Sequence, residues 1–179
     1  RYTDPMDLLP ERFSSGGPRP DVLHSASRPT TGVTVALEAE SPPRLALSNE
    51  AIQQGVRLFP LSASAPHSDR IGAAVPPSHG LFEALNAATW NAGVALFIPD
   101  GVDLQGNVEL LIDASASTQN VPRLLVIVGH GSRARIIEHH RGGTDGSKVV
   151  SVSELFVGKR ADVKYVLVQD WESTVSGHL

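Results

Sequence analysis

The sequence predicts a mainly β protein in which residues 93–179 form the first coils of a parallel β-helix. Beyond Gly93 the chain consists of short segments rich in β-branched residues that alternate with polar turns, a pattern typical of strands. Strand-turn-strand units recur at a near-constant interval, since the step from Ile98 to Val128 is almost the same as the step from Val128 to Val157. This interval favours stacked coils over antiparallel hairpins, whose turns come about every 8–12 residues without a longer period.

Residues 1–92 are predicted to form a small irregular and helical region in front of the coils. Proline, glycine, serine and threonine are frequent up to about residue 43, which argues against long helices there. One island, GVTVALE (32–38), alternates apolar and polar residues like a strand. A short helix is expected behind the Ser48 cap signal, with a break at Gly55 and a short strand after it.

A second helix, of about three turns, is expected near residues 78–90, after a proline-containing loop over residues 61–77. Ser78 is the candidate N-cap, and apolar residues follow at three- and four-residue spacing in LFEALNAATW. No further helix is needed downstream, because the remaining apolar segments are short and β-branched. Strands are expected at residues 94–99, 108–114, 123–129, 133–140, 149–158 and 162–171.

Composition narrows the range of functions. The formal net charge is −4, so a general attraction to nucleic acid phosphates or anionic membranes is not expected. The sequence contains no cysteine, which excludes disulfides, thiolate metal ligands and sulfur nucleophiles within it. Neither a membrane-spanning apolar run nor a signal peptide is visible, so a soluble cytoplasmic protein is expected. The start at Arg1, without a methionine, suggests a fragment or a processed terminus.

Three segments carry the most specific pattern of the chain: VPPSHGLFEALNAATWNAGVALFIPDGVDL (75–104), LLVIVGHGSRARIIEHHRG (124–142) and SELFVGKRADVKYVLVQDW (153–171). In their order and approximate spacing they resemble the SufB/SufD family of iron-sulfur cluster assembly proteins. The proline-rich lead-in, and the ESTVSGHL that follows QDW, are more similar to the SufD branch than to SufB.

The resemblance implies a right-handed parallel β-helix and a scaffold role rather than catalysis. A SufD-like subunit would act in the cytoplasm with SufB and the ATPase SufC, and the whole complex would handle the iron-sulfur cluster, with no cofactor in this chain. The family's SufC-docking segment, and the late cysteine and histidine of the SufB–SufD interface, have no counterpart in this sequence. Self-association through an exposed β-helix end is also expected, since such an end leaves backbone groups unpaired.

Gln169 and Trp171 match the family's Gln-x-Trp strand, which in SufB is proposed to line an interior path along which sulfur moves. A spacing of two residues puts both side chains on one face of a strand, as an inward pair requires. The same residues also fit a structural role, in which the amide completes a hydrogen-bond ladder between coils and the indole fills the core. Both interpretations stay open at the level of sequence.

No metal site and no catalytic residue is predicted. Glu138, His139 and His140 carry groups that suit iron or zinc, but neighbouring strand residues point to opposite faces. The Arg-Gly-Gly turn after His140 is expected to end the strand and to leave both histidines solvated. His130 is interpreted as a polar residue of a Gly-His-Gly turn, and the sequence supplies no second ligand for His178.

Two alternative functions come from other classes. A β-helix enzyme acting on carbohydrate, a lyase or a hydrolase, would need clustered acids. Asp100 and Asp103 are available at a turn, and Asp113 lies at a strand end with no acid near it in the repeat. The second alternative is a non-catalytic interaction module. RGGTDGSK (141–148) is expected to connect two coils rather than to bind phosphate, because a strand follows its lysine where a phosphate-binding loop requires a helix.

Overall fold

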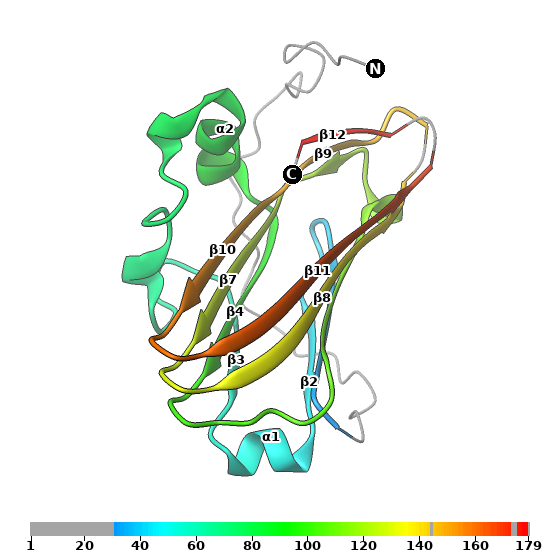
Figure 1. The fold of residues 1–179 in the computed structure, drawn as a ribbon. Coiled ribbons are helices and arrows are strands. Elements are labelled where there is room, and N and C mark those ends of the chain that lie inside the picture. The colour runs from blue at the N-terminus through cyan, green and yellow to red at the C-terminus, as the bar shows by residue number, and fades with distance from the viewer. Residues whose placement is uncertain (1–30, 144, 173–174, 179) are drawn as a thin grey trace.

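The structure, a computed structural model, describes residues 31–143, 145–172 and 175–178. This part of the chain is mainly β, as the sequence predicts, and its strands form three sheets (Figure 1). The strands are β1 (Val33–Glu38), β2 (Arg44–Leu47), β3 (Arg57–Pro60), β4 (Ala92–Ile98), β5 (Val108–Asp113), β6 (Gln119–Asn120), β7 (Pro122–Val128), β8 (Arg133–Gly142), β9 (Lys148–Val150), β10 (Val152–Val157), β11 (Asp162–Trp171) and β12 (Ser176–His178). The sheet orders are β11-β8-β5-β1-β2, β10-β7-β4-β3 and β12-β9-β6.

We call these sheets, in the order just given, the first, second and third sheets. From β4 onwards, successive strands belong to the second, first and third sheets in turn. We therefore call β4–β6, β7–β9 and β10–β12 the first, second and third coils. Each strand of one coil pairs in parallel with its counterpart in the next coil. Among the described strands, antiparallel pairing occurs between β1 and β2 and between β3 and β4. The two larger sheets are therefore mixed, and the small third sheet is parallel throughout.

The strand register agrees with the repeat found in the sequence. Ile98 pairs with Val128, and Val128 pairs with Val157, so the repeat interval is the step from one coil to the next. At the following turn, the N–H of Gly129 donates to Ile98 O and the N–H of Gly158 donates to Val128 O, both at 2.8 Å. The alignment of the three units is thus confirmed in register.

An aliphatic core lies between the two larger sheets. Alternate residues of the strands point inward and are buried, as the period of two in a strand requires. Burying one such side chain completely is worth about 1.5–3 kcal/mol, so this cluster is the main force that holds the sheets together. The inward residues are Val94, Leu96 and Ile98 of β4, Val108, Leu110 and Ile112 of β5, and Leu124, Val126 and Val128 of β7.

The N-terminal elements extend the first sheet. β1 confirms the strand expected at residues 32–38 and pairs in parallel with β5, in the place that a preceding coil would take. The short strand β2 was not predicted, because its four residues adjoin the stronger helix signal. That signal is confirmed by α1 (Asn49–Gln53), where Ser48 Oγ accepts the N–H of Ala51 at 3.1 Å. Residues 1–30 of the predicted lead-in lie outside the described residues.

The helix expected near residues 78–90 is present as α2 (Leu81–Thr89), beside the outer face of the second sheet (Figure 1). The prediction of Ser78 as its N-cap was wrong. Ser78 belongs to a separate 3-10 turn, η3 (Pro77–His79), and extended Gly80 precedes α2 without a side-chain cap. The reason is local, because the ring of Pro77 fixes φ in the range of a helical turn and starts η3 early. No described helix is long and apolar enough to cross a membrane.

Short elements account for the remaining differences from the sequence analysis. The strand expected at residues 149–158 is divided into β9 and β10 at Ser151, where the chain passes from the third sheet to the second. The third sheet was not foreseen, because β6 has two residues and carries no periodic signal. Two further 3-10 turns are η2 (Ser68–Arg70), in the predicted loop, and η4 (Ala114–Ala116), which follows β5.

Gly129 offers a test of coil stacking. A Cβ at this position would lie 2.4 Å from Asp100 N in the first coil, a backbone atom that cannot move aside. We expect Gly129→Ala to lower the free energy of unfolding by about 2–3 kcal/mol through overpacking, as measured by urea denaturation. Gly80→Ala is the control, because its Cβ would meet the flexible end of the Glu83 side chain. Equal losses in the two variants would contradict close stacking at this turn.

Candidate functional site

The interior between the two larger sheets changes from aliphatic to polar along the coils. The inward residues of β5 are aliphatic, whereas two of the inward residues of β8 and two of those of β11 are polar. Inward residues of β5, β8 and β11 that are in register form rows across these three strands. Val108 is in register with Ile136 and then Tyr165, Leu110 with Glu138 and then Leu167, and Ile112 with His140 and then Gln169.

Glu138 is the centre of this polar interior. Its side chain is buried and accepts hydrogen bonds from three sides. His140 Nε2 lies 2.6 Å from Glu138 Oε1, and Ser153 Oγ donates to both carboxylate oxygens at 3.0 and 2.9 Å. The hydroxyl of Tyr165 also donates to Glu138. A carboxylate from β8 therefore joins donors from β8, β10 and β11.

The pKa of Tyr165 depends on its burial and on the carboxylate of Glu138. Burial, and then the negative charge of Glu138 and the hydrogen bond to it, raise the pKa of Tyr165 well above its ordinary value of 10.0. Tyr165 is accordingly a neutral hydrogen-bond donor at physiological pH.

The expectation that the two histidines are solvated was wrong. β8 continues to Gly142 and stays paired with β11, so the strand does not end at His140. His140 is completely buried on the inward face with Glu138, and His139 points to the opposite face and is half-buried. The expected opposition of neighbouring side chains is confirmed. Within residues 31–143, 145–172 and 175–178, no three His, Cys, Asp or Glu side chains gather as metal ligands would.

Gln169 and Trp171 share the inward face of β11, in register with His140 and Gly142 of β8. Gln169 is exposed, because β11 is the last strand described in its sheet, and Trp171 is half-buried. The indole packs edge-on against His140, with ring centroids 5.9 Å apart at 85°. The structure thus places Gln169 in register with His140, and Trp171 against the His140 ring.

Several polar atoms near Glu138 lack a partner among the described residues. They are His140 Nδ1, Ser151 Oγ and Trp171 Nε1, all of them buried. Of these three residues, Ser151 lines a cavity of about 260 Å³, together with Glu138, Ser153 and Tyr165. Buried polar atoms without partners are uncommon and in many proteins are satisfied by water or by a bound group.

The other predicted residues take part in contacts between successive coils. The N–H of His130 donates to Asp100 Oδ1 at 2.7 Å, and His130 Nδ1 accepts the N–H of Lys159 at 2.9 Å. His130 thus links three stacked turns, in agreement with its interpretation as a turn residue. RGGTDGSK connects β8 to β9 without a helix, as expected, apart from Thr144, which is outside the described residues. The side chain of His178 also lies outside the described residues.

The three aspartates considered for a carbohydrate enzyme are engaged in the same way. Asp103 pairs with Arg133 at 3.3 Å, and Asp113 pairs with Arg141 at 3.2 Å. Burial acts to raise the pKa of Asp113, but the hydrogen bonds from Ser115 and the charge of Arg141 outweigh burial and lower it. Each of the three carboxylates contacts the next coil, an arrangement that does not favour paired acid-base catalysis.

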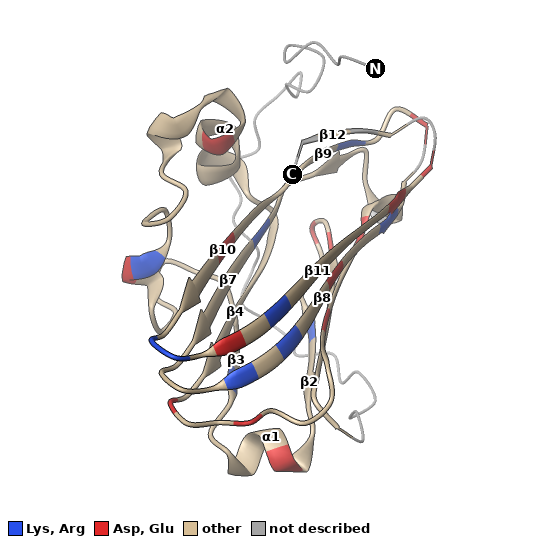
Figure 2. Cartoon of the chain, in the orientation of Figure 1, with Lys and Arg blue, Asp and Glu red and all other residues tan. Residues whose placement is uncertain are grey.

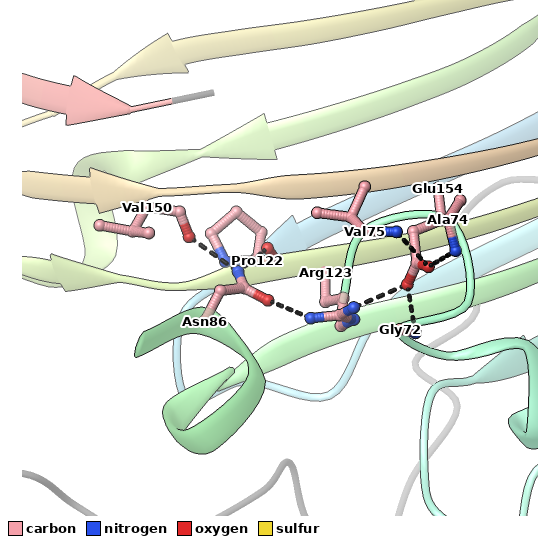
Figure 3. A network of polar contacts seen from close by, with 8 residues as sticks. All are labelled: Gly72, Ala74, Val75, Asn86, Pro122, Arg123, Val150 and Glu154. Atoms are coloured by element: carbon pink, nitrogen blue, oxygen red, sulfur yellow. Dashed lines mark hydrogen bonds and ion pairs between the residues drawn. The ribbon is translucent and has the colours of Figure 1, made fainter. Parts of the chain in front are cut away.

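Sequence reasoning missed a second buried polar cluster, on the outer face of the second sheet (Figure 3). Arg123 of β7 pairs with Glu154 of β10, with Nη2 and Oε1 2.7 Å apart and both side chains at most 1% exposed. Asn86 of α2 accepts from Arg123 Nη1 at 2.9 Å. It also donates to the carbonyl oxygens of Pro122 and Val150, at 2.8 and 2.9 Å.

Glu154 also binds the loop that precedes α2. The N–H groups of Gly72, Ala74 and Val75 donate to its carboxylate at 2.8, 3.0 and 3.2 Å (Figure 3). One carboxylate therefore fastens residues 72–75 to the second sheet, although the two segments are far apart in the sequence. The only sequence signal for this cluster was a charged residue at the start of the apolar segment that forms β7.

The acid sensitivity of this cluster is predictable. Burial would raise the pKa of Glu154, but the N–H of Gly72, the guanidinium of Arg123 and the N–H groups of Val75 and Ala74 outweigh burial and lower it below 4.5. The carboxylate therefore stabilises the fold above pH 4.5, and this contribution is lost as the pH falls through the lowered pKa.

We expect Glu154→Gln to be clearly less stable than wild type at neutral pH and to approach it as the pH falls through the lowered pKa of Glu154, because wild-type Glu154 then becomes protonated as well. Urea unfolding across this pH range measures the difference. Glu172→Gln, at an exposed position, is the control. A difference for Glu154→Gln that is constant with pH would contradict the lowered pKa.

Comparisons with known proteins agree with the strand pattern. The family described as SUF system FeS cluster assembly, SufBD core domain, matches residues 110–178, from β5 to β12. An iron-sulfur cluster assembly SufBD family protein of Staphylococcus aureus (strain MRSA252) is 25% identical over 131 residues, which cover 72% of this chain and 26% of the relative. A protein of the same description from Staphylococcus haemolyticus (strain JCSC1435) is 28% identical over 104 residues, which cover 56% of this chain and 22% of the relative.

The chain spans about a quarter of the length of these relatives. The match to the core domain begins in β5 and includes the polar interior around Glu138, with Gln169 and Trp171. On these findings, the chain is similar to the SufB/SufD family of iron-sulfur cluster assembly proteins, and they support the resemblance found in the sequence.

Proposed function

We propose that this chain is the early part of a SufD-like scaffold subunit for iron-sulfur cluster assembly. The observation that carries the proposal is the stacking of three coils in the register of the sequence repeat, of which the second and third lie within the region matched by the SufBD core domain. Residues 93–179 would be coils of a right-handed parallel β-helix, with residues 1–92 as the preceding region. Right-handed connections between parallel strands are strongly preferred in proteins, which supports this handedness.

The scaffold acts in the cytoplasm with SufB and the ATPase SufC, and it catalyses no reaction by itself. The cluster is handled by the whole complex, and this chain holds no cofactor of its own. The inter-coil contacts of Asp100, Asp103 and Asp113 support a structural role over a carbohydrate-active enzyme.

Affinity purification of the full-length gene product from its own cells tests the partners. We expect an ATPase of the SufC type and a second, different SufBD-family chain to copurify. Recovery of a SufD chain as that second component would assign this protein to the SufB branch. Recovery of neither an ATPase nor a second family member would overturn the proposed scaffold role.

Gln169 and Trp171 are proposed to line an interior path in the assembled complex. The register of Gln169 with His140, and the contact of Trp171 with the His140 ring, support this role. In the full-length protein, Gln169→Ala is expected to reduce cluster formation on the complex severalfold while the circular dichroism spectrum and the binding of partners stay unchanged. Asp170→Asn is the matched control, because its side chain leaves the opposite face of the same strand. Normal cluster formation in Gln169→Ala would leave the residue a structural role alone.

A further inference from the structure

A charged cavity of about 370 Å³ lies on the outer face of the first sheet, where β8 and β11 begin. Its lining includes three basic residues, two acidic residues and Gln105, all of them exposed. Figure 2 shows the basic positions on both strands, in a chain whose net charge is negative. The basic residues are Arg133, Arg135 and Lys164, and the acidic residues are Asp103 and Asp162.

Arg133 forms ion pairs with both acidic residues of the cavity. Its Nη1 lies 3.3 Å from Asp103 Oδ2 and its Nε lies 3.2 Å from Asp162 Oδ2, so an acid-base-acid ladder crosses the three coils. Among the described residues, no carboxylate lies within 4.0 Å of the charged groups of Arg135 or Lys164. The cavity therefore has two positive charges without a negative partner.

The register brings these two charges together. Lys164 of β11 is directly opposite Arg135 of β8, on strands that lie about 4.8 Å apart. Like charges at directly opposed positions destabilise a sheet. An anion between the two side chains would replace this repulsion by two charge-assisted hydrogen bonds.

We propose that this cavity binds a phosphate-type oxyanion, held between the guanidinium of Arg135 and the ammonium of Lys164. At least two charged oxygens are needed to engage both groups at once, and guanidinium geometry suits phosphate. The Gln105 amide lines the same cavity and makes a hydrogen bond of 3.4 Å to Asp103 O, which is long enough to be exchanged for a bond to the anion. Pairing of β8 with β11 fixes the backbone positions of Arg135 and Lys164.

Binding of inorganic phosphate to the full-length protein, measured by calorimetric titration at constant ionic strength, tests the site. We expect saturable binding, a dissociation constant raised at least about tenfold in Arg135→Gln/Lys164→Gln, and little change in Lys159→Gln/Arg160→Gln. The second variant removes the same charge from the neighbouring turn, outside the cavity lining. No saturable binding, or equal losses in the two double variants, would overturn the proposal.

Lys164→Glu separates anion binding from a general response to salt. Placing a carboxylate opposite Arg135 removes the repulsion, so the thermal midpoint is expected to rise in phosphate-free buffer and to lose its increase with phosphate. A wild-type midpoint that rises equally in phosphate and in chloride of the same ionic strength would overturn the proposal.

ATP in place of phosphate identifies the source of the anion. Tighter binding that is lost in Arg135→Gln/Lys164→Gln indicates a nucleotide, and equal affinity indicates free phosphate.

Discussion

Replacing Arg123 by Met is expected to lower the free energy of unfolding by about 3–5 kcal/mol, because it removes one partner of a buried ion pair. Glu154 would keep its charge at 0% exposure with the guanidinium gone, and the side-chain oxygen of Asn86 would lose its donor. Urea denaturation at neutral pH measures the loss. Arg44→Met is the control, because Arg44 makes its ion pair with Glu38 near the surface, where such pairs are worth about 0–1 kcal/mol.

A second variant separates the charge pair from the loop contacts. In Arg123→Met/Glu154→Leu no isolated charge is left, so part of the stability should return. Recovery should be incomplete, because the N–H groups of Gly72, Ala74 and Val75 lose their acceptor. Full recovery would show that these backbone contacts add nothing to the attachment of residues 72–75.

Replacing Glu138 by Leu is expected to cost about 1–3 kcal/mol, because the completely buried His140 loses its partner. The other two donors, Ser153 and Tyr165, are partly exposed and can hydrogen-bond to water instead. Glu109→Leu is the control, because Glu109 is exposed on the outward face of β5. Equal destabilisation by the two variants would contradict the central place of Glu138 in the polar interior.

Glu138→Gln gives a spectroscopic measure of the same contact. Removing the negative charge is expected to lower the pKa of Tyr165 towards its ordinary value, since that charge is one of the causes that raise it. Burial should keep the pKa above 10.0. Ultraviolet titration of the phenol records the shift, and an unchanged titration would place the cause in burial alone.

Local patterns were sufficient for most of the secondary structure. Ser48 and Gly55 marked the two ends of α1, because a cap and a left-handed glycine act within a few residues. The prediction of Ser78 as an N-cap was wrong, because Ser78 lies in a 3-10 turn that begins at the adjoining proline and that the spacing of apolar residues did not reveal. The prediction that the two histidines are solvated was wrong for another reason. The length of β8 depends on pairing with β11, a strand of the next coil that lies far beyond any local window of sequence.

The sequence by itself determined the mainly β class and the step from one coil to the next, because strand alternation and a repeat interval are properties of neighbouring and evenly spaced residues. Only the tertiary structure decided which polar side chains share an environment. Glu138 meets Tyr165, and Arg123 meets Glu154, through the stacking of successive coils. Such contacts depend on which face each strand buries and on what covers it, and no local pattern contains that information.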